Sequence, residues 1–399
     1  MGYRAQLRIA FVVGLLFWTC MAGQLPVIPL YVDSLGGTAE QVGWVMGSFA
    51  IGLLALRPQL GRCADRIGRV SVMRIGLLVA TVIPLCYALF PAIPLIMFFR
   101  AVHGISIAAF ATGFSALVAD LAPAPIRGKI VGYMTIVNPV GFAIGPVVGD
   151  WLAKTYGYPW LFGAVAGVGG TALLLTYGLA EVIPTAKAED FSQNLPLWRT
   201  WWHPRIRVPA MVLLLVGLAF GILTAFMPLF LKQVGIRMNV GLFYLAAALS
   251  GIVTRLQLAN WSDRWGRGIF VSLGICGYAL SSWIMYRAEN PEMVLLSGAM
   301  EGLGAGLVIP SIITITADRT TMQERGTVMG LVWMGFDLGI ALAGPAVGSL
   351  IQFVGLQNTF IVGTALTILG LVIFSSQSSG TLRGSWRFAT GRGKDYWAI

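Results

Sequence analysis

Long apolar stretches constrain this chain more than any other feature of its 399 residues. A helix needs about 20 apolar residues to cross the hydrocarbon core of a bilayer. Such stretches lie near residues 8–31, 42–60, 72–90, 94–120, 129–153, 159–181, 207–231, 240–258, 269–286, 292–317, 326–351 and 357–376. Only 11% of the residues are charged, where a soluble protein carries roughly a quarter. The sequence therefore predicts an all-α integral membrane protein with twelve transmembrane helices. We also expect the first stretch to remain in the protein, because it is too long for a cleaved signal peptide.

The lysines and arginines predict the orientation in the membrane. With the N-terminus placed in the cytoplasm, 20 of the 27 fall on the cytoplasmic side, and only Lys154, Lys232, Arg237 and Arg287 fall in outer loops. Positive residues concentrate on the cytoplasmic side of membrane proteins. We therefore expect a multi-pass protein of the cell (inner) membrane with both termini in the cytoplasm. Topology and anionic headgroups account for the net charge of +11, so nucleic acid is not an expected partner.

A long internal repeat divides the chain into two halves. A shift of 198 residues aligns Arg57 with Arg255 and Gly104 with Gly302, among other identities. This period is far too long for a solenoid. We predict two pseudo-symmetric six-helix halves at 1–181 and 207–380, a cytoplasmic linker at 182–206 and a cytoplasmic tail at 381–399.

The repeat includes a charged motif between the second and third helices of each half. GRCADRIGR contributes Gly61, Asp65, Arg66, Gly68 and Arg69, and its copy ANWSDRWGR contributes Asp263, Arg264, Gly266 and Arg267. With two parallel six-helix halves, this motif resembles the signature of the major facilitator superfamily. The resemblance implies a cytoplasmic latch between the halves, in which Asp65 faces the positive N-terminal end of the eleventh helix. Asp120 and Asp318 are the expected partners of Arg66 or Arg69 and of Arg264 or Arg267.

A glycine motif in the fifth helix resembles that of the drug/proton antiporter branch, which contains multidrug and arabinose-efflux-like exporters. Its residues are Gly132, Gly141, Gly145, Pro146 and Gly149, while Asp150 replaces the glycine that usually ends the pattern. The four-residue glycine spacing lets helices approach closely. The eleventh helix carries an imperfect copy.

Charged residues inside the predicted helices are candidates for proton coupling, because a charge in the bilayer core is costly to insert. Asp337 lies near the middle of the eleventh helix and is our main candidate. Glu301 in the tenth helix is symmetry-related to His103 in the fourth. Arg100 and His103 lie in RAVHG, which resembles a family motif whose arginine is linked to proton movement. The alternative is that these groups form structural pairs, for example Glu301 with Arg100.

The predicted substrate cavity has an aromatic and weakly polar lining, which suits a small amphipathic molecule. Its candidate residues are Trp18, Gln24, Asn138, Phe226, Tyr244 and Trp333. We predict a proton-coupled antiporter that exports such a molecule by alternating access and works as a monomer in contact with membrane lipid. A lipid or lysolipid flippase and an importer or uniporter remain alternatives. Scattered cysteines and two distant histidines indicate no metal site, and we expect neither a cofactor nor enzymatic activity.

Overall fold

The computed structural model describes residues 3–123, 126–181, 201–321 and 325–398, without the side chains of 58, 127–129, 258–265 and 325–327. Every regular element in these ranges is a helix, and the chain divides into two compact units. The all-α prediction is confirmed.

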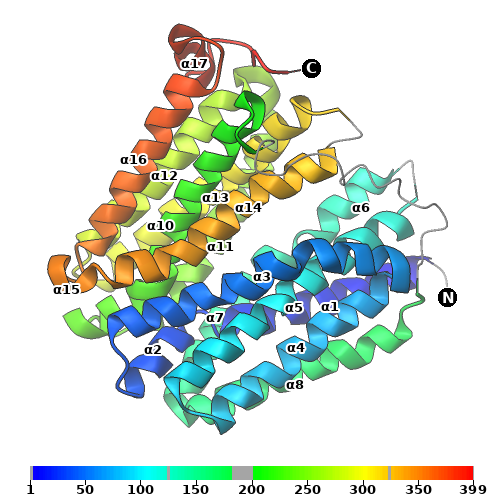
Figure 1. The fold of residues 1–399 in the computed structure, drawn as a ribbon, viewed down its shortest axis with the longest axis vertical. Helices are drawn as coiled ribbons and strands as arrows, with labels where there is room; N and C mark the ends of the chain where they lie inside the picture. Colours follow the sequence, from blue (N-terminus) through cyan, green and yellow to red (C-terminus); the bar gives the residue numbers. More distant parts are fainter. Residues whose placement is uncertain (1–2, 124–125, 182–200, 322–324, 399) are drawn as a thin grey trace. The chain divides into compact units, whose positions relative to one another are not determined.

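The first unit comprises Met1–Ala188 together with Asn239–Leu245. Its helices are α1 (Tyr3–Gly23), α2 (Val27–Ser34), α3 (Ala39–Ile67), α4 (Arg69–Leu89), α5 (Ile93–Leu121), α6 (Arg127–Met134), α7 (Val137–Tyr156) and α8 (Tyr158–Leu175), followed by the 3₁₀ turn η2 (Thr176–Gly178). Helix α5 packs against both α3 and α4, while α1 packs against α7 and α8 (Figure 1).

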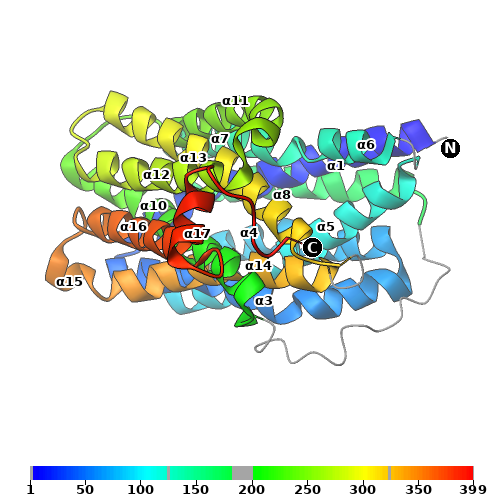
Figure 2. The same ribbon diagram turned by 90° about the horizontal axis from the view of Figure 1, so that it is seen from above.

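The second unit comprises Glu189–Met238 and Ala246–Ile399. Its helices are α10 (Pro204–Val234), α11 (Gly241–Trp265), α12 (Arg267–Tyr286), α13 (Pro291–Asp318), α14 (Arg325–Gly348), α15 (Ile351–Val354), α16 (Thr359–Gln377) and α17 (Leu382–Ala389). The first turn of α11 is counted with the first unit. Helix α10 packs against α14 and α16, and the short α17 lies at the end of α16 (Figure 1 and Figure 2).

The predicted transmembrane stretches all have counterparts among these helices. In the described residues, eleven helices are long and apolar enough to cross a membrane, and α11 adds the shorter apolar segment Gly241–Gln257. Their polar backbone groups are bonded within each helix, which is what a bilayer interior requires. The chain is therefore a multi-pass membrane protein.

The two units also repeat the same close helix crossing. A Cβ atom at Gly104 in α5 would overlap the carbonyl oxygen of Phe49 in α3. In the second unit, a Cβ at Gly302 in α13 would overlap the carbonyl oxygen of Ala247 in α11. Both residues of the second contact are displaced by 198 from those of the first. The sequence repeat is thus a repeat of backbone packing.

Candidate functional site

The first charged motif forms an ion-pair cluster where α3 meets α4. Arg69 donates from Nε to Oδ2 of Asp120 at 3.1 Å and from Nη1 to Oδ1 of Asp65. Gly68 joins the two helices with φ of +108°, a backbone conformation that favours glycine. Of the two candidate partners for Asp120, the structure therefore selects Arg69, while Arg66 is exposed.

The second motif repeats this geometry where α11 meets α12. Arg267 forms an ion pair with Asp318, and Gly266 joins the helices with φ of +78°. The side chains of Asp263 and Arg264 lie outside the described residues. The predicted pairing of a motif arginine with the acid that ends α5 or α13 is present in both units.

Glu181 is a member of the first cluster that the sequence reasoning missed. Its Oε1 accepts from the backbone N–H of Val70 at 2.8 Å, and its Oε2 accepts from the N–H and the hydroxyl of Ser71 at 2.8 and 2.7 Å. Helix α4 begins after Gly68, which has no side chain to cap it, so its first N–H groups need an acceptor from elsewhere. A carboxylate is favoured at this positive helix end. Through Glu181, the C-terminal end of the first half is thereby hydrogen-bonded to the start of α4, next to the first charged motif.

The glycine motif of the fifth predicted helix begins with Gly132 in α6, and its other residues lie along α7, where they pack against the backbone of α1. A Cβ at Gly145 would overlap the carbonyl oxygen of Thr19, and one at Gly149 would overlap that of Gly23. Gly141 lies equally close to Trp18, whereas Gly132 has open space beside it. The close approach that the glycine spacing predicts is present.

Gly339, from the imperfect copy of this motif, and Gly335, one turn before it, make a corresponding contact between α14 and α10. A Cβ at Gly339 would overlap the carbonyl oxygen of Leu214, and one at Gly335 would overlap that of Ala210. Backbone therefore meets backbone along this pair of helices, as it does along α1 and α7. Asp337 lies between these two glycines in the sequence and is 7% exposed.

Asp150 occupies the position where the resemblance leads one to expect a final glycine. It is 1% exposed, and its Oδ2 accepts from Nζ of Lys154 at 2.8 Å and from the N–H of Val240 at 3.2 Å. The departure from the family pattern thus places a carboxylate at the start of α11, within the first unit. The sequence alone assigned no role to this aspartate.

Arg100 and His103 belong to a buried polar cluster in the first unit. The Tyr87 hydroxyl and Nδ1 of His103 are 3.0 Å apart, and Arg100 interacts electrostatically with Tyr87. The guanidinium of Arg100 lies 4.4 Å from the ring centroid of Phe49, a cation–π arrangement. Nε of Arg100 and Nε2 of His103 are buried without a hydrogen-bond partner among the described residues. Tyr87, on α4, is the member that sequence reasoning missed.

Glu301 belongs to a polar cluster in the second unit. It is 6% exposed and interacts electrostatically with Tyr278 and with Arg255. Both clusters therefore join a tyrosine of the third helix of a half to a titratable residue of its fourth helix. Each tyrosine follows the start of its helix by a different number of residues, so the 198-residue alignment did not reveal this correspondence.

The predicted cavity residues differ in exposure. Phe226 is fully buried and Tyr244 is 3% exposed, while Trp18, Asn138 and Trp333 are half-buried. The Trp333 ring meets that of Phe336 edge-on, with centroids 5.9 Å apart.

Gln24, a polar residue of the predicted lining that directly follows α1, is also buried. Its Nε2 donates to the carbonyl of Cys20 at 3.3 Å, and its Oε1 is buried without a partner among the described residues.

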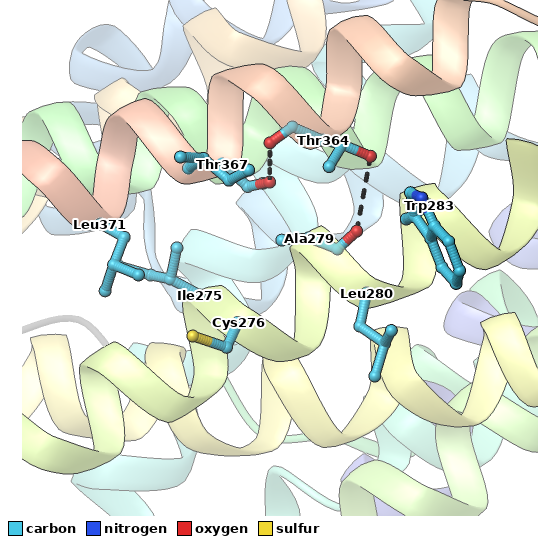
Figure 3. Close-up of a pocket in the computed structure, with 9 residues that line it drawn as sticks. Ile275, Cys276, Ala279, Leu280, Trp283, Thr364, Thr367 and Leu371 are labelled. Carbon is cyan, nitrogen blue, oxygen red and sulfur yellow. Dashed lines mark hydrogen bonds between the residues drawn. The ribbon is translucent and has the colours of Figure 1, made fainter.

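An apolar groove of about 270 Å³ lies between α12 and α16 in the second unit (Figure 3). Its lining contains none of the predicted site residues and consists of Ile275, Cys276, Ala279, Leu280, Trp283, Thr364, Thr367, Ile368 and Leu371. The two threonine hydroxyls bond to backbone carbonyls, of Ala279 for Thr364 and of Thr364 for Thr367. The groove therefore offers apolar contact and few groups that could orient a polar ligand.

The sequence model of the Major Facilitator Superfamily matches residues 10–267 and 245–382. The chain belongs to this superfamily. Its charged motifs and its division into two units agree with that membership. The protein is thus a transporter of the major facilitator superfamily, as its sequence resemblance predicted.

Two relatives of this major facilitator transporter are named as drug-resistance proteins. Multidrug resistance protein 1 of Bacillus subtilis (strain 168) is 23% identical over 356 residues, covering 88% of this chain and 90% of its own. Quinolone resistance protein NorA of Staphylococcus aureus (strain COL) is 26% identical over the same coverage. The predicted resemblance to the drug-efflux branch is confirmed.

Solved structures confirm the fold. The nucleoside transporter NupG gives a TM-score of 0.77 at 14% identity, over 94% of this chain and 99% of its own. A bacterial homolog of the human lysosomal transporter Spinster, inward-facing and unoccupied, gives 0.74 over 99% of this chain and 98% of its own. The predicted twelve-helix major facilitator fold is therefore correct.

Proposed function

We propose that this transporter is a proton-coupled antiporter that exports a small amphipathic molecule by alternating access. The observation that carries the proposal is the pair of buried carboxylates, Glu301 and Asp337, on membrane-spanning helices of the second unit. A carboxylate in a membrane interior is costly to keep, so it is a functional candidate by default. Protonation removes that cost, and the protonated and charged forms favour different surroundings.

Asp337 is the main proton-binding group in this proposal. Glu301, which lies in a polar cluster with Tyr278 and Arg255, is the second candidate. Asp337 lies between Gly335 and Gly339, where the backbone of α14 is in contact with that of α10. Movement of α14 along α10 would therefore change the surroundings of this carboxylate. Such movement couples proton binding to conformation through a population shift.

The proposed latch lies in the charged motifs at the ends of α3 and α11. The ion pairs of Arg69 with Asp120 and of Arg267 with Asp318 fix the local geometry of each motif. Asp65 then faces the eleventh helix of the other half in the conformation that is closed to the cytoplasm. The latch stabilises one conformer without touching substrate, so it acts on the rate of conformational exchange.

The proposed orientation places both termini in the cytoplasm of a cell whose inner membrane holds the protein. The distribution of lysine and arginine supports this orientation. A reporter fused after Ile399 should be accessible only from the cytoplasmic side. Access from outside would overturn both the orientation and the direction of export.

The function is tested in proteoliposomes that contain the purified protein, with or without an acidic lumen. The names of the curated relatives make a labelled fluoroquinolone the first probe, next to a lipophilic cation and a fluorescent lysophospholipid. Vesicles in which the cytoplasmic face of the protein points outward should accumulate an amphipathic probe in their lumen only when that lumen is acidic. Counterflow without a pH gradient should persist, because exchange needs no net proton movement.

The rival functions give different results in the same assay. Uptake that only equilibrates the probe, with or without a pH gradient, indicates a uniporter, and movement of the lysophospholipid alone indicates a flippase. Accumulation driven by a gradient of opposite sign indicates a proton-coupled importer. Any of these three results would refute the proposed antiport.

A further inference from the structure

The C-terminal helix α17 (Leu382–Ala389) is held against the ends of two membrane-spanning helices. Phe388 lies against Gly268 in the first turn of α12, and its ring centroid is 5.9 Å from that of Phe374 near the end of α16. The Ser272 hydroxyl donates to the carbonyl of Ala389 at 2.9 Å. Because α12 and α16 are membrane-spanning segments, α17 lies at the depth where a bilayer's headgroups begin.

The opposite face of α17 has the composition of a helix that lies in a membrane interface. Leu382 is 70% exposed and Trp386 is 61% exposed, one turn apart. Arg383 and Arg387 are also exposed, and they lie one turn apart from each other on the flank next to this apolar pair. Apolar and aromatic side chains next to arginines are typical of interfacial helices, and tryptophan is enriched at this depth.

The tail exposes positive charge that its acidic residue does not offset. Asp395 accepts two hydrogen bonds from the buried Arg319, at 2.8 and 2.9 Å. Arg392 and Lys394 are exposed like the arginines of α17. In the described part of the chain, none of these four basic side chains takes part in a salt bridge. The exposed surface of α17 and the tail is therefore cationic and complementary to an anionic partner.

We propose that α17 binds anionic phospholipids of the adjacent leaflet, with Arg383 and Arg387 on the headgroup phosphates and Leu382 and Trp386 inserted beside them. The occupant is a bilayer lipid, since the exposed apolar pair would gain nothing from a free phosphate ion. The pair of arginines is spaced by one helical turn, so both can reach a headgroup layer at once. This inference concerns regulation by the membrane and does not depend on the transported molecule.

The test uses the full chain in lipid nanodiscs of phosphatidylcholine with increasing phosphatidylglycerol, including a brominated form that quenches tryptophan. The contribution of Trp386 is the difference in quenching between the wild-type protein and Trp386→Phe. Each basic residue near a charged bilayer surface strengthens binding by about fivefold. The double variant Arg383→Gln/Arg387→Gln should therefore need about 25-fold more phosphatidylglycerol for half-maximal quenching, or should lose its preference for that lipid.

A matched control removes the same charge from the other end of the chain. Arg4 and Arg8 are exposed and also one turn apart on α1, so Arg4→Gln/Arg8→Gln should leave the Trp386 signal unchanged. Inorganic phosphate should not compete. Equal quenching by brominated phosphatidylcholine and phosphatidylglycerol in the wild type would overturn the proposal. So would competition by phosphate, or a change of oligomeric mass in the α17 variant without a change in lipid preference.

Discussion

The ion pair between Arg319 and Asp395 offers a sharp test of how the C-terminal tail is held. Arg319 is 1% exposed and is the largest fully buried side chain among the described residues. Its guanidinium also donates to the carbonyls of Arg205 at 3.1 Å and Ser378 at 3.0 Å. One side chain thus connects α10, α13, the end of α16 and the tail.

Asp395→Asn removes the negative charge and leaves the guanidinium buried. The amide oxygen keeps one hydrogen bond, but the amide NH₂ then faces a donor of Arg319. Breaking a buried ion pair by altering one partner costs about 3–5 kcal/mol. That range applies here, and not the smaller cost of breaking a surface ion pair, because the side chains of Arg319 and Asp395 are only 1% and 10% exposed. Local opening of the tail should increase by roughly 100-fold to 4,000-fold.

Hydrogen–deuterium exchange of residues 382–389, read by mass spectrometry, measures this opening directly. Protection should fall by the same factor, or to complete loss if the wild-type protection is smaller. Glu289→Gln makes the same charge change at an exposed loop position and should leave α17 protected. Protection within twofold of wild type in Asp395→Asn would refute the reasoning that the pair holds the tail.

Three further predictions concern packing, the latch and the cavity. Gly302→Ala should destabilise the protein by about 1–3 kcal/mol through overlap with α11, seen as a lower melting temperature, whereas Gly163→Ala, with open space beside it, should not. Asp65→Asn should slow transport while leaving the protein folded, and a wild-type rate across a range of pH gradients would contradict the latch. Cysteine at Asn138 or Trp333 should react with a small hydrophilic thiol reagent and be protected by substrate, and failure to react in every state would place these positions outside an aqueous cavity.

The sequence predicted those parts of the structure that are repeated or periodic. Apolar stretches gave the helices, because a bilayer demands a fixed length of apolar residues. The 198-residue shift aligned Arg69 with Arg267 and Asp120 with Asp318, and both ion pairs are present. Two copies of one pattern made a chance match improbable, so the sequence predicted that each aspartate pairs with a motif arginine, although it left two candidate arginines open for each.

Contacts that occur once could not be predicted in this way. Glu181 and Val70 are 111 residues apart, and Arg319 and Asp395 are 76 apart. Neither pair has a copy in the other half or a local spacing that would reveal it. Tyr278 was missed as the partner of Glu301 for a related reason, because an apolar helix offers many aromatic residues and sequence does not fix which one faces a buried acid.

Candidate cavity residues were the least predictable. An aromatic side chain on a membrane helix can line a cavity or pack against a neighbour, and its sequence position is the same in both cases. Phe226 is fully buried, whereas Trp333 is half-buried. The packing of neighbouring helices decides between these outcomes, and that information is spread over the whole unit.

The central claim is that protonation of Asp337 drives export. The direct measurement is uphill accumulation of the probe that the wild-type protein transports, in proteoliposomes with an acidic lumen and the cytoplasmic face outward. Asp337→Asn mimics the protonated carboxylate, so it should abolish accumulation while counterflow of the same probe persists, and Glu301→Gln should reduce accumulation less. Uphill accumulation at the wild-type level in Asp337→Asn would contradict the claim, and its loss in Glu301→Gln alone would assign the proton to Glu301.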